Sequence, residues 1–207
     1  TLAEVLVEQG YGTLAIGKWH LTPAEEHHLG APRKRWPLGR GFERFYGFHG
    51  SDTSQFHPDL VYDNHQAIQD KTPAQGYHFT DDLTNDAIHW LHQHDAVAGD
   101  KPFFLYFATG ATHSPHQVPK EWIEKYKGKF NQGWDILRDQ NFQREKKLGV
   151  IPANTIDTPR PPGLPAWDAM NPDEKKLVAH EAEVYAAYAA QTDYEIGRLL
   201  DAVKEEG

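Results

Sequence analysis

Two short apolar runs constrain the fold of this chain more than any other feature of the sequence. They occupy residues 13–16 and 103–108, and each follows a segment whose apolar residues recur at helical spacing, residues 1–9 and 80–98. Short, continuously apolar runs are typical of strands that a sheet buries on both faces. Because these strands alternate with helices, the sequence predicts an α/β fold with a mostly parallel sheet flanked by helices.

The segments around these runs complete the first half of the chain. Gly10 suits the position just after the end of the first helix. Residues 21–80 are rich in Gly, Pro, His and aromatic residues, and we interpret them as loops with one small hairpin at 62–68. Thr80 is expected to cap the helix that continues to residue 98.

The rest of the chain is predicted to be helical, with one extended connector. Pro119 is expected to begin a short helix that Gly128 ends, and a second helix covers about 134–147. Five prolines indicate an extended connector at 149–167. Asn171 is followed by proline and two acidic residues, which predicts the cap of a long helix that continues to Glu206.

Composition excludes several classes of protein. Leu, Ile, Val and Phe make up 43 of the 207 residues, which is enough apolar mass for a hydrophobic core. The net charge of −9 argues against a nucleic-acid partner bound through a basic surface. No run approaches ~18 apolar residues, so no membrane segment is predicted. The chain has no cysteine, which excludes a disulfide, a thiolate metal site and a cysteine nucleophile within it.

The two ends of the sequence suggest a larger protein. Thr1 opens directly into a helical segment, Met170 is the single methionine, and the last residues read as the inside of another helix. We therefore interpret residues 1–207 as an internal fragment, the central part of one catalytic domain whose amino- and carboxyl-terminal portions are missing. The strands at 13–16 and 103–108 are then expected to lack sheet neighbours, so that the chain alone has marginal stability. The compartment is left open between cytoplasm and periplasm.

Polar residues follow the first apolar run at once. Lys18 lies just past it and His20 two residues later, so an extended backbone would project both side chains to one face. An ammonium group beside an imidazole suits a tetrahedral anion such as sulfate or phosphate, with lysine supplying charge and histidine a hydrogen bond or a proton. The alternative is a surface lysine beside a structural histidine.

A second polar loop follows the other apolar run. His113 comes five residues after that run, in a turn stiffened by Pro115, and suits a general acid aimed at a leaving-group oxygen. The alternative is an ordinary loop histidine, and His116 beyond the proline has a weaker claim. Ligands of open α/β sheets bind beyond the carboxyl ends of the strands, so Lys18, His20 and His113 are expected at one sheet edge.

The other histidines and carboxylates do not form a metal motif. His27 and His28 are adjacent, and His89 shares a helix face with His92, but no carboxylate at helical spacing completes a motif of the H-E-x-x-H type. We interpret them as solvated or structural. The remaining polar candidates are given structural readings as helix-terminus, turn and mid-helix residues: His94, Asp63, Asn64, Asp81, Asp82 and Asp193.

Aromatic residues are frequent in the loop-rich segment. Trp36, Phe45, Tyr46 and Phe48 are candidate walls of a substrate pocket, or alternatively ordinary packing residues.

Residues 10–20 carry a resemblance to a known family. They read G-Y-G-T-L-A-I-G-K-W-H and match the signature G-Y-x-T-x-x-x-G-K-x-H of the type I sulfatases at every fixed position. Residues 103–116 resemble the strand and loop that present a later histidine of that family. Further segments resemble the group related to bacterial arylsulfatases: 42–48, 57–60, 77–80 and 193–200. The resemblance covers essentially the whole chain and implies the alkaline-phosphatase-like fold.

The resemblance implies a mechanism. Members hydrolyse sulfate esters with a formylglycine nucleophile made from Cys or Ser in a C/S-x-P-x-R motif, and a divalent cation, usually calcium, is held by three Asp and one Asn. Lys18 would bridge the sulfate and the formylglycine. His20 would hydrogen-bond the formylglycine hydroxyls and help the hemiacetal collapse. His113 would bind a sulfate oxygen and protonate the leaving group.

The chain also departs from the family pattern. It contains no C/S-x-P-x-R motif and no identifiable set of metal ligands, so the nucleophile and the cation site are expected outside residues 1–207, and the chain alone is expected to be inactive. The predicted substrate is a small-molecule or saccharide sulfate ester. Two alternatives stay open: a phosphodiester or phosphonate monoester hydrolase of the same superfamily, and a non-catalytic anion-binding fragment or pseudoenzyme.

Overall fold

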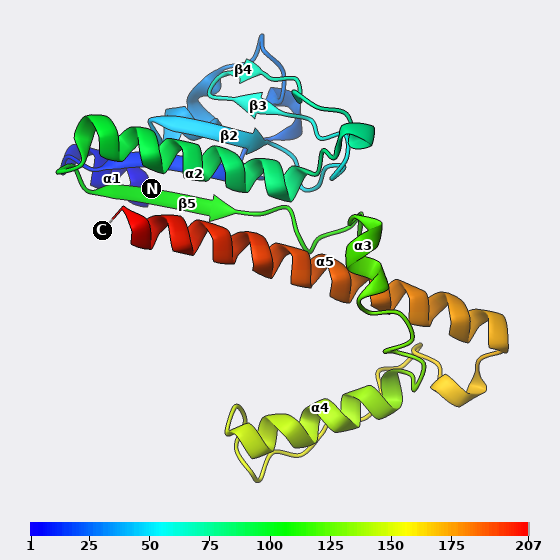
Figure 1. Cartoon of the computed structure of the whole chain (residues 1–207). Helices are drawn as coiled ribbons and strands as arrows, with labels where there is room; N and C mark the ends of the chain where they lie inside the picture. Colours follow the sequence, from blue (N-terminus) through cyan, green and yellow to red (C-terminus); the bar gives the residue numbers. More distant parts are fainter. Residues whose placement is uncertain (207) are drawn as a thin grey trace. The chain divides into compact units, whose positions relative to one another are not determined.

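A computed structural model describes residues 1–206 and divides the chain into two compact units. Unit 1 comprises residues 1–119 and the end of the chain from Tyr188, and unit 2 comprises residues 120–187. Unit 1 contains the whole sheet, and unit 2 is built from helices and an extended connector (Figure 1). Within residues 1–206, no helix has the length and apolar character needed to cross a membrane.

The sheet of unit 1 has five strands in the order β4-β3-β2-β1-β5. β1 is central and runs parallel to both β2 and β5, whereas the short β3 and β4 form an antiparallel hairpin beside β2. The strands span these residues: β1 Gly12–Lys18, β2 Arg44–Phe48, β3 Val61–Tyr62, β4 His65–Gln66 and β5 Phe103–Ala108. The predicted parallel α/β sheet, both apolar strands and the hairpin are therefore confirmed.

β2 lies inside the segment that we interpreted as loops. A glycine in a strand interior lowers strand propensity, and Gly47 sits near the middle of β2. The structure gives the reason for that glycine. A Cβ at position 47 would lie 1.9 Å from the carbonyl oxygen of Gly17 on β1. The close approach of β1 and β2 therefore requires a glycine at position 47, and this same glycine made the strand hard to predict from the sequence.

The two apolar strands differ in their surroundings. β1 is buried along almost its whole length and has a neighbour on each side, so the expectation that it lacks sheet neighbours is wrong. β5 lies at the edge of the described sheet, and Phe103 and Tyr106 are 37% and 44% exposed. Residues three apart in a strand point to opposite faces, so the prediction that β5 is buried on both faces is wrong for residues 1–206.

The ends of α1 agree with the sequence prediction, whereas the start of α2 differs from it. α1 spans Leu2–Glu8, is capped by Thr1, and is followed by Gly10 with φ 87°, as predicted. α2 spans Phe79–Ala98, but its cap residue is His78 and not Thr80. Thr80 is fully buried inside the first turn, where its hydroxyl donates a hydrogen bond to a buried glutamine, so packing decides its place.

The later helices agree with the predicted order. α3 spans Lys120–Glu124, ending before the predicted Gly128, and α4 spans Trp134–Leu148. α5 spans Pro172–Glu205, and Asn171 caps it as predicted, because its Oδ1 accepts the backbone N–H groups of residues 173 and 174 at 3.0 Å each. Single 3-10 turns occur at Ala24–Glu26, Arg33–Arg35, Pro37–Arg40, Pro73–Gln75 and Trp167–Ala169.

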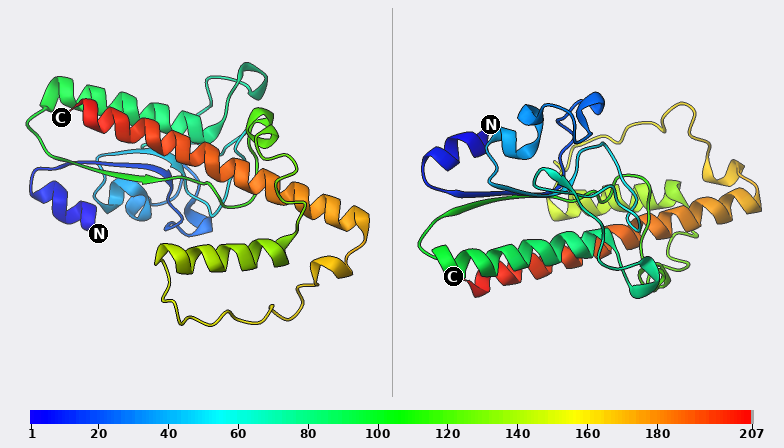
Figure 2. Two further views of the ribbon diagram at one scale, coloured as in Figure 1. Left: turned by 60° about the horizontal axis from the view of Figure 1, so that its bottom comes forward. Right: turned by 90° about the horizontal axis from the view of Figure 1, so that it is seen from above.

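Two hydrophobic clusters cover the two faces of the sheet. Leu14, Ile16 and Phe48 pack with α2 and with the last turns of α5 on one face. These two helices run side by side there, and Arg198 of α5 pairs with Asp81 of α2 at 2.9 Å (Figure 2). The other face packs against α1 and the loop that follows β1. The clusters hold the three parallel strands in register, so that they end together.

Candidate active site

The carboxyl ends of β2, β1 and β5 form one edge of the sheet. Gly17 of β1 pairs with Gly47 of β2 and with Ala108 of β5, and each strand ends within one residue of this level. The edge therefore receives Lys18 and His20 from β1, residues 49–52 from β2, and the loop with His113 from β5. The structure thus places all three sequence-predicted site residues on segments that leave the same edge.

Gly17 sets the close spacing of β1 and β5 at this edge. Its φ is 103°, and a Cβ there would lie 1.9 Å from the carbonyl oxygen of Ala108. Only glycine adopts this conformation without strain and lets the β1 and β5 backbones approach so closely. The residue before Lys18 therefore fixes the direction in which the chain leaves the strand.

The segment after β1 continues along the end of β2. The Trp19 backbone N–H donates to the Phe48 carbonyl at 3.0 Å, and the His20 N–H donates to the His49 carbonyl at 3.1 Å. Trp19 is buried, and its indole N–H donates to the Arg35 carbonyl at 2.9 Å. The indole of Trp19 therefore anchors the segment between the two candidate residues.

Lys18 and His20 flank this anchor in different backbone conformations. Lys18 is half-buried at the end of the strand, and among residues 1–206 its ammonium group has no ion-pair or hydrogen-bond partner. His20 is exposed and has φ 51°, in the left-handed region. The prediction that both side chains project to one face is therefore wrong, because it requires extended backbone and His20 is left-handed. Instead, His20 lines a cleft together with His27, Arg35 and Asp52.

His113 is held at the tip of the loop after β5. Its backbone N–H donates to the Gly110 carbonyl at 3.1 Å, and its Nδ1 lies 2.8 Å from the Ser114 carbonyl oxygen. Because a carbonyl oxygen only accepts hydrogen bonds, Nδ1 carries the proton in this contact. The other ring nitrogen, Nε2, does not take part in it. The ring is exposed, and within residues 1–206 no hydrogen bond joins it to Lys18 or His20.

Sequence reasoning missed one histidine at this edge. His49 follows β2 directly and is only 4% exposed, in contact with Trp36 at 4.3 Å and Phe45 at 5.6 Å between ring centroids. Neither ring nitrogen has a hydrogen-bond partner within residues 1–206. Burial, together with the nearby His27, lowers the pKa of His49 to about 4. The signal that could have identified His49 is its position directly after a strand. That signal was not recognised, because we interpreted β2 as a loop.

The aromatic residues of the loop-rich segment are packing residues. Trp36, Phe45 and Phe48 are each 1% exposed, and Tyr46 donates its hydroxyl to Asp82 at 2.6 Å. Of the two readings that the sequence allowed, ordinary packing is therefore correct for the three buried rings.

The carboxylates that the sequence interpreted as structural have protein partners. Asp81 lies in the first turn of α2 and pairs with Arg198, and Asp82 accepts a second hydroxyl from Tyr77 at 2.8 Å. Asp63 pairs with Arg44 at 3.2 Å. Asp193 is exposed on α5.

A divalent cation needs several oxygen or nitrogen ligands in one place. In the part of the chain that the structure describes, no three His, Asp or Glu side chains come together in this way. His92, one of the spaced histidines, instead lies 3.4 Å from a Glu206 carboxylate oxygen. The described residues therefore do not fit the cation that the family resemblance implies, and no chemical step is assigned to it here.

Comparison with known proteins identifies the family. The family model named Sulfatase matches residues 1–207. An uncharacterized sulfatase of Schizosaccharomyces pombe is 33% identical over 221 residues, which cover 100% of this chain and 38% of that protein. An arylsulfatase of Klebsiella aerogenes is 32% identical over 217 residues, covering 100% of this chain and 44% of that protein. The chain thus spans less than half the length of these relatives.

Solved structures agree on the fold. One is the complex of a protein with its substrate, D-glucosamine-2-N,6-O-disulfate; it superimposes with a TM-score of 0.57 at 18% identity, over 100% of this chain and 47% of that protein. At this identity the match supports the fold alone, which is the alkaline-phosphatase-like α/β fold expected from the resemblance. On the full-length match to the family model and two relatives above 30% identity, the chain belongs to the sulfatase family.

Proposed function

We propose that this chain supplies part of the active site of an enzyme that hydrolyses sulfate esters to an alcohol and sulfate. The observation that carries the proposal is the arrangement of the parallel sheet edge. The G-K-x-H segment leaves β1 where the His113 loop leaves β5, in a chain of the sulfatase family. In this view residues 1–207 are the central part of the catalytic domain.

Lys18 is proposed to bind the sulfate group. Its ammonium lies at the end of a buried strand without a competing carboxylate partner among residues 1–206. A half-buried ammonium attracts an anion more strongly than a fully solvated one, because the effective dielectric constant is lower there. The positive charge also stabilises the negative charge that the sulfate oxygens carry as the S–O bond breaks.

His113 is proposed to protonate the leaving oxygen. When the S–O bond to the alcohol breaks, that oxygen takes a proton, and water supplies the oxygen that completes the released sulfate. The Nδ1–H of His113 is held by the Ser114 carbonyl, so Nε2 is the atom that is oriented to donate the proton. A general acid of this kind contributes about 10²–10⁴-fold to the rate.

His20 is proposed to act as a hydrogen-bond donor beside Lys18. It lines the cleft at the same strand end, where Arg35 is also present but is paired with Glu26. The family resemblance assigns its partner as the formylglycine nucleophile. Neither a cysteine nor a C/S-x-P-x-R motif occurs in residues 1–207, so we assign no step to that nucleophile within this chain.

The substrate class is proposed to be saccharide or aryl sulfate esters. One relative is an arylsulfatase, and one protein of the same fold is solved with a disulfated glucosamine as its substrate. An aryl sulfate and the 6-O-sulfate of that glucosamine are both sulfate esters of alcohols that carry a ring. The open cleft beside His20 would receive the ring that remains after the sulfate leaves.

The test uses the full-length protein that contains this chain. Turnover of an aryl sulfate is expected, and Lys18→Ala and His113→Ala are each expected to lower kcat/KM by more than ~10²-fold. Lys71→Ala and His65→Ala serve as matched controls. They change exposed residues of the same types that do not lie at the carboxyl ends of β1 and β5. Full turnover in Lys18→Ala or His113→Ala would refute the role assigned to that residue. A matched phosphate ester tests the sulfate preference, since faster phosphate hydrolysis would favour the phosphodiesterase alternative.

A further inference from the structure

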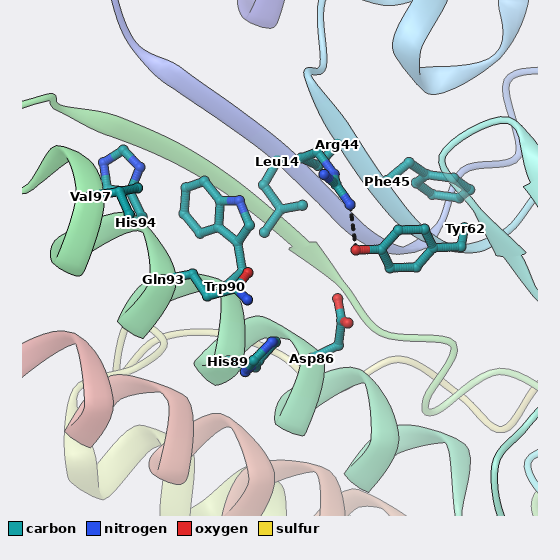
Figure 3. Close-up of a pocket in the computed structure, with 10 residues that line it drawn as sticks. All are labelled: Leu14, Arg44, Phe45, Tyr62, Asp86, His89, Trp90, Gln93, His94 and Val97. Carbon is teal, nitrogen blue, oxygen red and sulfur yellow. Dashed lines mark hydrogen bonds between the residues drawn. The ribbon is translucent and has the colours of Figure 1, made fainter.

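A second polar cavity lies on the α2 side of the sheet, away from the candidate active site. It encloses about 200 Å³ between the last turns of α2 and the strands β1–β3 (Figure 3). Leu14 and Arg44, which line it, form the first register pair of β1 with β2, whereas Lys18 and Phe48 form the last. Four residues of strand separate the two levels by about 13 Å.

Asp86 differs from the other carboxylate on this side of α2. Asp82, one turn earlier, accepts hydroxyl hydrogens from Tyr46 at 2.6 Å and Tyr77 at 2.8 Å. The Asp86 carboxyl has no hydrogen-bond or ion-pair partner among residues 1–206, and it points into the cavity (Figure 3). Burial, and next the charge of Asp82, raise the pKa of Asp86 to about 6. The carboxyl is therefore mostly ionised at pH 7.5 without a direct ion pair among residues 1–206, and only the more distant charges of His89 and Arg44 act to lower its pKa.

Aromatic rings form two further walls. One face of Trp90 stacks on His94, with centroids 4.9 Å apart and an interplanar angle of 19°. Figure 3 shows the indole between His94 and the space in front of Asp86. The Tyr62 ring stands across the cavity from α2, on β3. A partly buried carboxylate beside aromatic rings is a combination that favours an organic cation.

Two fixed charges line the cavity, those of Asp86 and Arg44, together with the imidazoles of His89 and His94. The Arg44 guanidinium is already paired with Asp63 at 3.2 Å and with the Tyr62 hydroxyl. The Asp86 carboxylate has no such partner among residues 1–206, so a bound cation would offset the cost of leaving it unpaired.

We propose that this cavity binds a small organic cation, a primary ammonium group carried on a single ring. The ammonium would donate hydrogen bonds to Asp86, and the ring would lie against Trp90. Ligand pockets for drug-sized molecules enclose roughly 300–1,000 Å³, so a cavity of about 200 Å³ suits one ring. The site is independent of the proposed sulfate chemistry, because no residue of the candidate active site lines it.

The test compares two ligands of nearly equal shape. Cyclohexylammonium and cyclohexanol differ in the charge of one group, and their binding to the full-length protein at pH 7.5 and low salt is measured by titration calorimetry. The ammonium is expected to bind at least ~10-fold more tightly, since only it forms an ion pair with the partly buried Asp86 carboxylate. Equal binding of the two ligands, or a preference for D-glucose over cyclohexylammonium, would overturn the proposal and would indicate recognition of hydroxyl groups.

Variants locate the binding on the cavity. Asp86→Asn is expected to weaken cyclohexylammonium binding at least ~10-fold, whereas Asp95→Asn, an exposed aspartate of α2 outside the cavity, leaves it unchanged. Arg44→Gln removes the positive charge and is expected to tighten binding. This opposite sign keeps the proposal testable if Asp86→Asn fails to fold. Unchanged binding in Asp86→Asn, or weaker binding in a folded Arg44→Gln, contradicts it. None of these measurements depends on sulfate ester turnover.

Discussion

Replacing His49 by phenylalanine should remove a specific dependence of stability on pH. The imidazole is 4% exposed, stacks near Trp36 and Phe45, and has a pKa of about 4 in the folded protein. In the unfolded chain the same group has a pKa near 6.5. The folded state therefore binds this proton less readily than the unfolded state does. Its contribution to stability is fully present above pH 6.5 and is lost as the pH falls toward 4.

The size of the effect follows from these two pKa values. Integrating the proton linkage between pH 7.5 and pH 4.5 gives a loss of about 2.5 kcal/mol in the free energy of unfolding. His49→Phe keeps an aromatic ring against Trp36 and Phe45 and abolishes this loss. It also removes two buried nitrogens that have no partner among residues 1–206, each of which costs about 1–3 kcal/mol, although the larger ring offsets part of that gain.

The assay is urea unfolding at both pH values, followed by tryptophan fluorescence. Trp36 lies 4.3 Å from the His49 ring and reports on this part of unit 1. The decisive quantity is the stability difference between variant and wild type at pH 4.5 minus that at pH 7.5, because every other titrating group is shared. His65→Phe, at an exposed position on β4, is the matched control. A double difference below about 0.5 kcal/mol would show that His49 is not a buried neutral imidazole.

Three further predictions concern the elements that position the candidate site. Gly47→Ala places a Cβ 1.9 Å from the Gly17 carbonyl oxygen, so β1 and β2 must separate; thermal unfolding should show a loss of at least about 3 kcal/mol, and an unchanged midpoint would contradict the register. Tyr46→Phe removes one of two hydroxyl donors to Asp82 and should cost about 1–3 kcal/mol in urea unfolding. Asn171→Ala removes the cap of α5 and should cost about 1 kcal/mol, whereas Asn171→Asp should retain most of the stability.

The fold was predictable from sequence to the extent that its signals are local. Residues 13–16 and 103–108 are short apolar runs, and Gly10 and Asn171 mark helix ends through hydrogen bonds within a few residues. β2 was not predicted because Gly47 is required by the close contact with β1, a constraint that the residues around Gly47 do not reveal. Thr80 was misread as a cap for the same reason, since its burial and its hydrogen bond to the distant Gln55 outweigh its capping propensity.

The polar residues of the candidate site and the second cavity also fall into two groups, those predictable from the sequence and those that depend on tertiary packing. Lys18, His20 and His113 were predicted from motif and strand position alone, and the segments that carry them do leave one sheet edge, because the carboxyl ends of parallel strands lie together. His49 and Asp86 could not be found in this way. Their properties come from burial by Trp36 and Phe45 in one case and from the packing of α2 on the sheet in the other.

The sequence by itself therefore determined the family, the α/β class and the segment that leaves β1, because these rest on residue order and short-range backbone preferences. The tertiary structure decided which polar groups acquire partners. Asp82 receives one tyrosine hydroxyl from β2 and a second from Tyr77, just before α2, while Asp86, one turn along the same helix, faces a cavity without a partner among residues 1–206. The two carboxylates look alike in the sequence and differ because desolvation and hydrogen bonding depend on which residues pack around them.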